Sequence, residues 1–148
     1  MTTVQELLQG KPGEVWTVAP DDTVFHALQL MADKDIGALP VVGPSGLVGI
    51  LSERDYARRG ILQGRASKDT LVRDIMTTSL HSVQPSHSLD RCMTLMTHKH
   101  VRHLPVVDAQ GALVGVVSIG DVLKAIIRQQ QDHITQMTLR DTAGSVLD

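Results

Sequence analysis

The chain has 148 residues, of which 42% are hydrophobic and 20% are charged, and its formal net charge is −2. This composition is typical of a soluble globular protein, and the slight acidic excess argues against nucleic-acid binding, which requires a basic face. No apolar run approaches the length of a membrane span, and the single cysteine, Cys92, excludes an internal disulfide and fits a reducing compartment. Since the first ten residues also lack the pattern of a signal peptide, we expect a cytoplasmic protein without membrane contact.

The first half of the chain predicts a short strand, a helix, a hairpin and a second helix, in that order. The first helix follows Thr23, a favourable N-cap residue, and its apolar residues recur at the spacing of one helix face: Val24, Ala27, Leu28 and Met31. Two apolar runs, residues 38–42 and 47–51, flank the turn GPSG and predict the hairpin. The second helix is expected to start at Ser52 and to run to about residue 62.

The second half repeats this order. An offset of 65 aligns TVAPDDTVFHALQLMADKDIGALPVV (17–42) with SVQPSHSLDRCMTLMTHKHVRHLPVV (82–107), and an offset of 66 aligns LVGILSERD (47–55) with LVGVVSIGD (113–121). The helix after Ser88 carries the same apolar face in Leu89, Cys92, Met93 and Met96. A β-α-β-β-α unit is therefore present twice. The expected division is a first repeat over 4–64, a linker and lead-in over 65–79, a second repeat over 80–131 and a polar, loosely ordered tail over 132–148.

Each repeat contains a Ser-x-x-Asp motif at the start of its second helix, Ser52 with Asp55 and Ser118 with Asp121. One interpretation is a capping box, in which the serine and the acidic residue satisfy free backbone amides at the helix start. The other interpretation is a binding site, because a helix N-terminus attracts phosphate and an aspartate accepts hydrogen bonds from both hydroxyls of a ribose. The motif by itself leaves both interpretations open.

The chain resembles the CBS-domain pair over about residues 4–130. The resemblance is carried by VAPDDTVFHALQLMADKDIGALPVV with GLVGILSERD, and by LVRDIMT leading into RHLPVVDAQGALVGVVSIGD. It implies an α+β fold in which the two β-α-β-β-α repeats pack about a pseudo-twofold axis. It also implies a regulatory module that binds AMP, ADP, ATP, NAD or S-adenosylmethionine in clefts between the repeats and signals to a separate effector protein. The resemblance favours the binding interpretation of Asp55 and Asp121.

The resemblance further implies which residues share each cleft. The first cleft would combine Ile50, Ser52, Arg54, Asp55, Val101, Arg102 and His103. The second cleft would combine Thr17, Ala19, Gly37, Ala38, Ser118, Gly120 and Asp121. The first cleft offers Arg54, Arg102 and His103 to phosphate groups, whereas the second has glycines and an alanine at the matching positions. We therefore expect only the first cleft to distinguish ATP from adenosine.

We expect no catalytic residues, since the sequence has no Walker loop and no cluster of carboxylates for phosphoryl transfer. A nucleotide hydrolase and a structural oligomerisation module with empty clefts are the alternatives. The segment HKHVRH (98–103) holds three histidines near Cys92, but a helix end and a strand do not direct them to one point, so we expect no metal site. We also expect a homodimer formed through an apolar side of DVLKAII: Val122, Leu123, Ile126 and Ile127.

Overall fold

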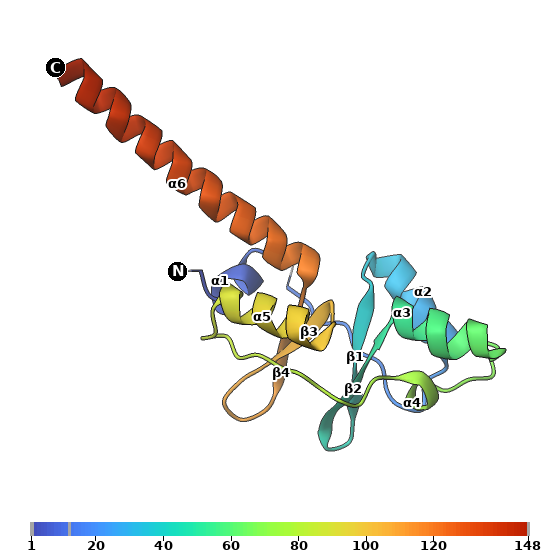
Figure 1. Cartoon of the computed structure of the whole chain (residues 1–148). Helices are drawn as coiled ribbons and strands as arrows, with labels where there is room; N and C mark the ends of the chain where they lie inside the picture. Colours follow the sequence, from blue (N-terminus) through green and yellow to red (C-terminus); the bar gives the residue numbers. More distant parts are fainter. Residues whose placement is uncertain (1, 12, 148) are drawn as a thin grey trace.

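The structure of the chain, a computed structural model, describes residues 2–11 and 13–147 and the side chains up to residue 140. Two halves lie side by side, and one long helix projects from the second half (Figure 1). The elements in chain order are α1 (Val4–Gln9), α2 (Val24–Lys34), β1 (Ala38–Gly43), β2 (Gly46–Ser52), α3 (Glu53–Asp55), the π-helical turn η1 (Tyr56–Gly60), the 3-10 turn η2 (Ile61–Gln63), α4 (Val72–Ile75), α5 (Leu89–Lys99), β3 (His103–Val107), β4 (Leu113–Ser118) and α6 (Ile119–Leu147).

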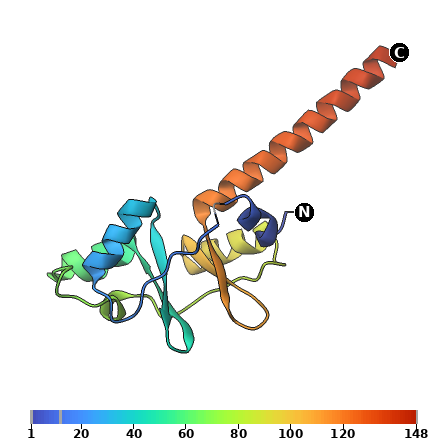
Figure 2. The same cartoon turned by 180° about the vertical axis from the view of Figure 1, so that it is seen from behind.

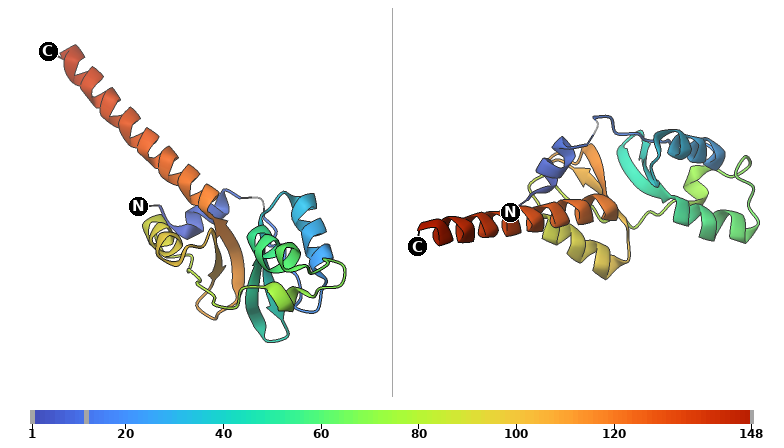
Figure 3. Two further views of the ribbon diagram at one scale, coloured as in Figure 1. Left: turned by 45° about the vertical axis from the view of Figure 1, so that its right-hand side comes forward. Right: turned by 90° about the horizontal axis from the view of Figure 1, so that it is seen from above.

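The two hairpins lie next to each other, with helices on the outer side of each (Figure 3). β1 pairs antiparallel with β2, and β3 pairs antiparallel with β4, with a register shift at the matching position of each pair. The register places Ser52 opposite Ala38 and Ser118 opposite His103. Each Ser-x-x-Asp motif therefore begins where the second strand of its hairpin ends. The predicted lead strands are reduced to single parallel bridges at Val18 and Val83.

The first helix of each repeat forms where its sequence pattern predicts it. The Thr23 side chain accepts a hydrogen bond from the backbone N–H of His26 at 3.1 Å, and Ser88 caps α5 in the same way at 3.2 Å. Both helices end at a residue in the left-handed conformation, Asp35 with φ 54° and His100 with φ 55°. The predicted apolar faces are confirmed, and their most deeply buried members are Val24, Ala27, Met31, Leu89, Cys92 and Met96.

Each half of the molecule completes its core with a segment that precedes the other repeat. Val4 of α1 is fully buried in the core of the second half, whereas Val72 of α4 is fully buried in the core of the first. The backbone N–H of Val4 donates to the His87 carbonyl at 2.9 Å, and that of Val72 donates to the Asp22 carbonyl at 2.8 Å. This exchange ties the halves together. The expected division of the chain at residues 64 and 80 stays a prediction, and residues 4–9 pack with the second repeat.

The last helix differs from the sequence-based expectation. Residues 132–147 continue α6 and are not a loosely ordered tail, and the helix extends well away from both halves (Figure 2). The expected dimer surface is partly internal, because Val122 is fully buried and Ile126 packs against the second core. Leu123 and Ile127 remain exposed. Among the described residues no helix, α6 included, has both the length and the hydropathy to span a membrane.

Candidate functional site

Both Ser-x-x-Asp motifs form capping contacts. The Asp55 N–H donates to Ser52 Oγ at 3.1 Å, and the Ser52 N–H donates to Asp55 Oδ2 at 2.9 Å. The second motif repeats this geometry, with 3.1 Å from the Asp121 N–H to Ser118 Oγ and 3.0 Å from the Ser118 N–H to Asp121 Oδ2. The capping interpretation is therefore correct for both motifs. It does not exclude binding, because capping uses only one of the two oxygens of each carboxylate.

The two aspartates differ in what the second oxygen contacts. Asp55 Oδ1 accepts a hydrogen bond from Thr77 Oγ1 at 3.0 Å, so both of its oxygens have protein donors. At Asp121, the Lys11 ammonium instead donates to the capping oxygen Oδ2 at 2.7 Å, and it also donates to the Val116 carbonyl at 3.0 Å. Of the described residues, none donates to Asp121 Oδ1. Asp121 can therefore accept a ligand hydroxyl without losing its cap.

A cavity of about 510 Å³ lies beside Asp121, at the seam between the two halves. Three small residues form part of its walls: Gly37 and Ala38 at the start of β1, and Ser118 at the end of β4. Its apolar lining comes from Leu8, Val15, Ile36, Pro40, Val114 and Val116. The site thus combines the motif of the second repeat with the first strand of the first repeat, which is the arrangement that the family resemblance implied for the second cleft.

The cavity matches the predicted second cleft in part. Gly37, Ala38, Ser118 and Asp121 line it, whereas Thr17, Ala19 and Gly120 do not. His103, which we assigned to the first cleft, also lines this cavity. A Cβ atom at Gly37 would lie 3.5 Å from His103 Nε2, which shows how closely the two hairpins approach here.

The predicted first cleft is less developed. Ile50 pairs through its backbone with Thr77, whose hydroxyl meets Asp55, so this side of the motif is filled by the segment that follows α4. Arg54 and Arg102 are exposed. The Arg102 carbonyl accepts a hydrogen bond from the backbone of α6 at 2.8 Å. Neither the cavity at Asp121 nor a second one of about 430 Å³ between α1 and α6 is lined by the remaining predicted residues of this cleft: Ile50, Ser52, Arg54, Asp55, Val101 and Arg102.

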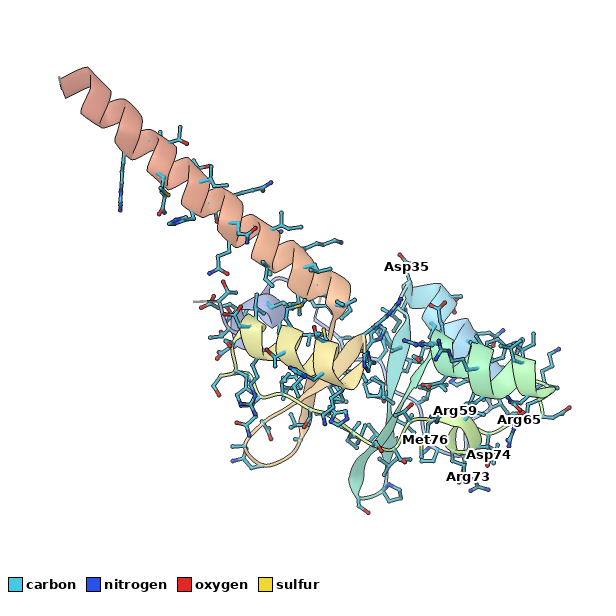
Figure 4. The ribbon with its side chains drawn as sticks, in the orientation of Figure 1. Asp35, Arg59, Arg65, Arg73, Asp74 and Met76 are labelled. Atoms are coloured by element: carbon cyan, nitrogen blue, oxygen red, sulfur yellow. The ribbon has the colours of Figure 1, made fainter. Side chains whose placement is uncertain are left out.

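The residues of this cavity that sequence reasoning did not assign to it include two lysines and the tryptophan. Lys11, Trp16 and Lys34 all line it, and the Lys34 ammonium lies 4.2 Å from the centroid of the Trp16 ring. Both lysines lie outside the positions that match Arg54, Arg102 and His103, so those positions alone do not give the charge of this cavity. The signal that could have found Lys11 is the likeness of VQELLQ (4–9) to VRDIMT (72–77): Thr77 ends the second segment and contacts Asp55, and Lys11 lies two residues after the first segment and contacts Asp121. Asp35 stands at the end of α2 nearest the second half (Figure 4).

The charges in the cavity affect each other. Partial burial acts to raise the pKa of Asp121, but the hydrogen bonds from Lys11 and Ser118 and the charge of Lys11 outweigh it and lower that pKa. Burial is the largest influence on the pKa of His103 and lowers it; the Asp121 carboxylate opposes this, while Lys11 and Arg102 lower it further. At neutral pH the cavity therefore holds an ionised Asp121 and a neutral His103. Within the described side chains, no three histidine, cysteine or acidic groups gather as metal ligands.

Comparisons with known proteins show which family this chain resembles. The family model for the CBS domain matches residues 12–61 and 72–128. CBSX3, a mitochondrial CBS domain-containing protein of Arabidopsis thaliana, is 39% identical, over 92% of this chain and 70% of that protein. YhcV, a CBS domain-containing protein of Bacillus subtilis, is also 39% identical, over 90% of this chain and 86% of that protein.

Solved structures show the same likeness. A CBS-domain protein of Burkholderia ambifaria has a TM-score of 0.83 and 49% identity, covering 87% of this chain and 96% of that one. The structure of CBSX2 in complex with AMP has a TM-score of 0.69 and 32% identity, covering 86% and 98%. The CBS domain pair of protein MJ0100, in complex with methylthioadenosine and S-adenosylmethionine, has a TM-score of 0.74 and 25% identity, also covering 86% and 98%.

Proposed function

Because the chain belongs to the CBS-domain family, we propose that it is a regulatory module whose cavity at Asp121 binds an adenosine-containing ligand. The proposal rests on the hydrogen bonds that the two carboxylate oxygens of Asp121 accept. Its capping oxygen is held by Ser118 and Lys11, while its other oxygen has no donor among the described residues and can accept hydrogen bonds from ribose hydroxyls. The cavity volume of about 510 Å³ lies within the usual range for small-molecule sites.

The lining of the cavity supports a mononucleotide as the ligand. The apolar side chains and the Trp16 ring suit the faces of an adenine. Lys11 and Lys34 supply two cations within the same cavity, which suits a phosphate group. We take AMP as the first candidate, because a related structure contains it. ADP, ATP, NAD and S-adenosylmethionine complete the set to be compared.

We propose that the cleft at Asp55 binds more weakly. Both oxygens of Asp55 already accept hydrogen bonds from the protein, so a ribose hydroxyl would have to share Oδ1 with the Thr77 hydroxyl or displace it. A displaced hydroxyl would also have to find water or another acceptor, and the exchange gains little net free energy.

The two relatives compared above are named CBS domain-containing proteins, a name that carries no enzyme activity. We therefore propose that ligand binding changes the contacts of this chain with a separate effector protein and that the chain catalyses no reaction. A structural oligomerisation module with empty clefts and a nucleotide hydrolase remain the alternatives for the experiment to exclude. The unpaired, buried thiol of Cys92 is compatible with the cytoplasmic location that we propose.

Calorimetric titration of ligand-stripped protein with AMP, ATP, NAD and S-adenosylmethionine tests the proposal. Trp16 is the only tryptophan in the chain and lines the cavity, so its fluorescence reports binding at Asp121 and not at Asp55. We expect AMP to bind with a parallel change in this fluorescence. If none of the four ligands releases heat or alters Trp16, the chain is not a nucleotide sensor. Turnover of ATP with magnesium would instead indicate the hydrolase.

A further inference from the structure

The part of α6 that projects from the molecule carries exposed apolar side chains. Every residue from Ile127 to Arg140 is exposed, although Gln129 contacts Thr2 and Asp132 still borders the cavity beside α1. Farther along, the helix projects with no other element beside it (Figure 4). The family model ends at residue 128, so this projection lies outside the part of the chain that the domain accounts for. At a rise of 1.5 Å per residue the whole of α6 is roughly 43 Å long. A helix of this kind gains most of its stability from packing against a partner.

The exposed apolar residues of α6 follow the spacing of a coiled-coil seam. Leu123 is 42% exposed, Ile127 52%, Ile134 61% and Met137 51%, and with Gln130 they follow one another at intervals of four, three, four and three residues. This is the a and d pattern of two heptads, with isoleucine at both a positions and Leu123, Gln130 and Met137 at the d positions. The result is one narrow stripe along the exposed part of the helix, interrupted by Gln130, with Leu139 as an exposed apolar residue off the stripe.

The composition of this stripe identifies its partner. β-branched residues at a with leucine at d favour two-stranded parallel coiled coils, and this stripe has isoleucine at both a positions and leucine at one of its three d positions. The single polar residue, Gln130, would be left without a partner against an apolar surface, but in an in-register parallel pair it meets the same side chain of the second helix. The flanking e and g positions hold Lys124, Ile126, Gln131, His133 and Thr138. In a parallel pair Lys124 faces Ile119 of the other helix, so no like charges face each other. We propose that α6 pairs in parallel and in register with α6 of a second copy of this chain.

This seam differs from the dimer surface expected from the sequence, since it omits Val122 and Ile126, which pack in the second core, and extends to Met137. The pairing does not depend on ligand binding at Asp121. It would place the two cavities of a dimer at the same end of a shared helical stem.

The first test is sedimentation equilibrium or light scattering of the full chain at micromolar concentrations. We expect a dimer, and we expect Ile134→Glu to weaken it by at least about 100-fold, because the change removes an apolar contact and places two carboxylates against each other. Leu139→Glu is the matched control: Leu139 is 64% exposed on the same helix but lies off the seam, so its replacement should leave the dimer intact. Thermal unfolding confirms that neither change disturbs the two cores.

Disulfide trapping tests the direction of the pair. Ile127→Cys alone and Ile134→Cys alone should each form a disulfide-linked dimer on mild oxidation, since a parallel in-register pair brings identical a positions together. The native thiol of Cys92 is buried and does not compete. A monomeric wild-type protein would overturn the proposal, and so would a dimer that persists in the Ile134→Glu variant. The monomer would indicate that the stripe binds a helix of another protein. A disulfide only between Ile127→Cys and Ile134→Cys in a mixture would overturn the parallel arrangement.

Discussion

Replacing Lys11 by methionine separates its two expected roles, as the partner of Asp121 and as a cation for phosphate. The ion pair spans 2.7 Å, but the two side chains are 38% and 26% exposed, so water screens it. Partly exposed pairs of this kind stabilise a protein by about 0.2–1 kcal/mol. For a chain of this size we therefore expect Lys11→Met to lower the melting temperature of the free protein by only about 1–3 °C.

The effect on ligand binding should be larger and selective. Loss of one hydrogen bond from an ammonium to a phosphate costs about 1.5–3 kcal/mol, which corresponds to roughly 10- to 150-fold weaker AMP binding. Adenosine has no phosphate, and removal of Lys11 leaves Asp121 freer to accept its ribose hydroxyls, so its affinity should stay the same or increase. Calorimetry, followed in parallel by Trp16 fluorescence, measures both affinities.

The matched control is Lys68→Met. The Lys68 ammonium lies 5.0 Å from the centroid of the Phe25 ring and does not line the cavity, so its removal should not alter the ratio of AMP to adenosine affinity. If Lys11→Met weakens AMP and adenosine equally, Lys11 does not meet a phosphate, and the assignment of the cavity to a nucleotide loses its basis. An unchanged AMP affinity would lead to the same conclusion.

The remaining predictions concern the caps, the pH dependence and two buried glycines. Asp121→Ala should weaken AMP about 10- to 150-fold, whereas Asp55→Ala should mainly lower the melting temperature of the free protein; calorimetry and thermal unfolding compare them. Since the folded state lowers the pKa of His103, the free energy of unfolding should decrease as the pH falls below 6.5. Urea titrations at pH 5 and pH 7 measure this decrease, and we expect it to be smaller in the His103→Gln variant. Gly49→Ala should destabilise the protein by about 1–3 kcal/mol more than Gly115→Ala does. A Cβ atom at Gly49 would lie 2.9 Å from the backbone carbonyl of Thr77, which cannot easily move, whereas a Cβ atom at Gly115 would meet only the flexible side chain of Leu8. Equal melting temperatures of these two variants would show that the close approach is relieved elsewhere.

The local structure of each repeat could be predicted from the sequence because it depends on residues close together in the chain. Thr23 and Ser88 cap α2 and α5, the apolar spacing marks their buried faces, and the short turns between apolar runs mark the hairpins. The duplication of these patterns predicted two equivalent halves. The confirmed family membership required no more than the order and spacing of these motifs.

The Ser-x-x-Asp motifs show where this reasoning reaches its limit. The sequence predicts identical caps at Asp55 and Asp121, and both caps form. What contacts the second oxygen depends on segments far away in the sequence: Thr77 reaches Asp55, whereas Lys11 reaches Asp121 from 110 residues earlier. No pattern within one repeat contains this difference.

The sequence by itself determined the repeat, the helices and hairpins, and the capping motifs, because these follow from periodicity and from contacts within a few residues. Only the tertiary structure decided that α1 completes the second core, that α4 completes the first, and that Lys11 and Trp16 therefore stand in a cavity beside Asp121. The physical reason is the exchange of these segments. Each must bury its apolar residues, such as Val4 and Val72, and only the packing of both halves fixes which core receives them.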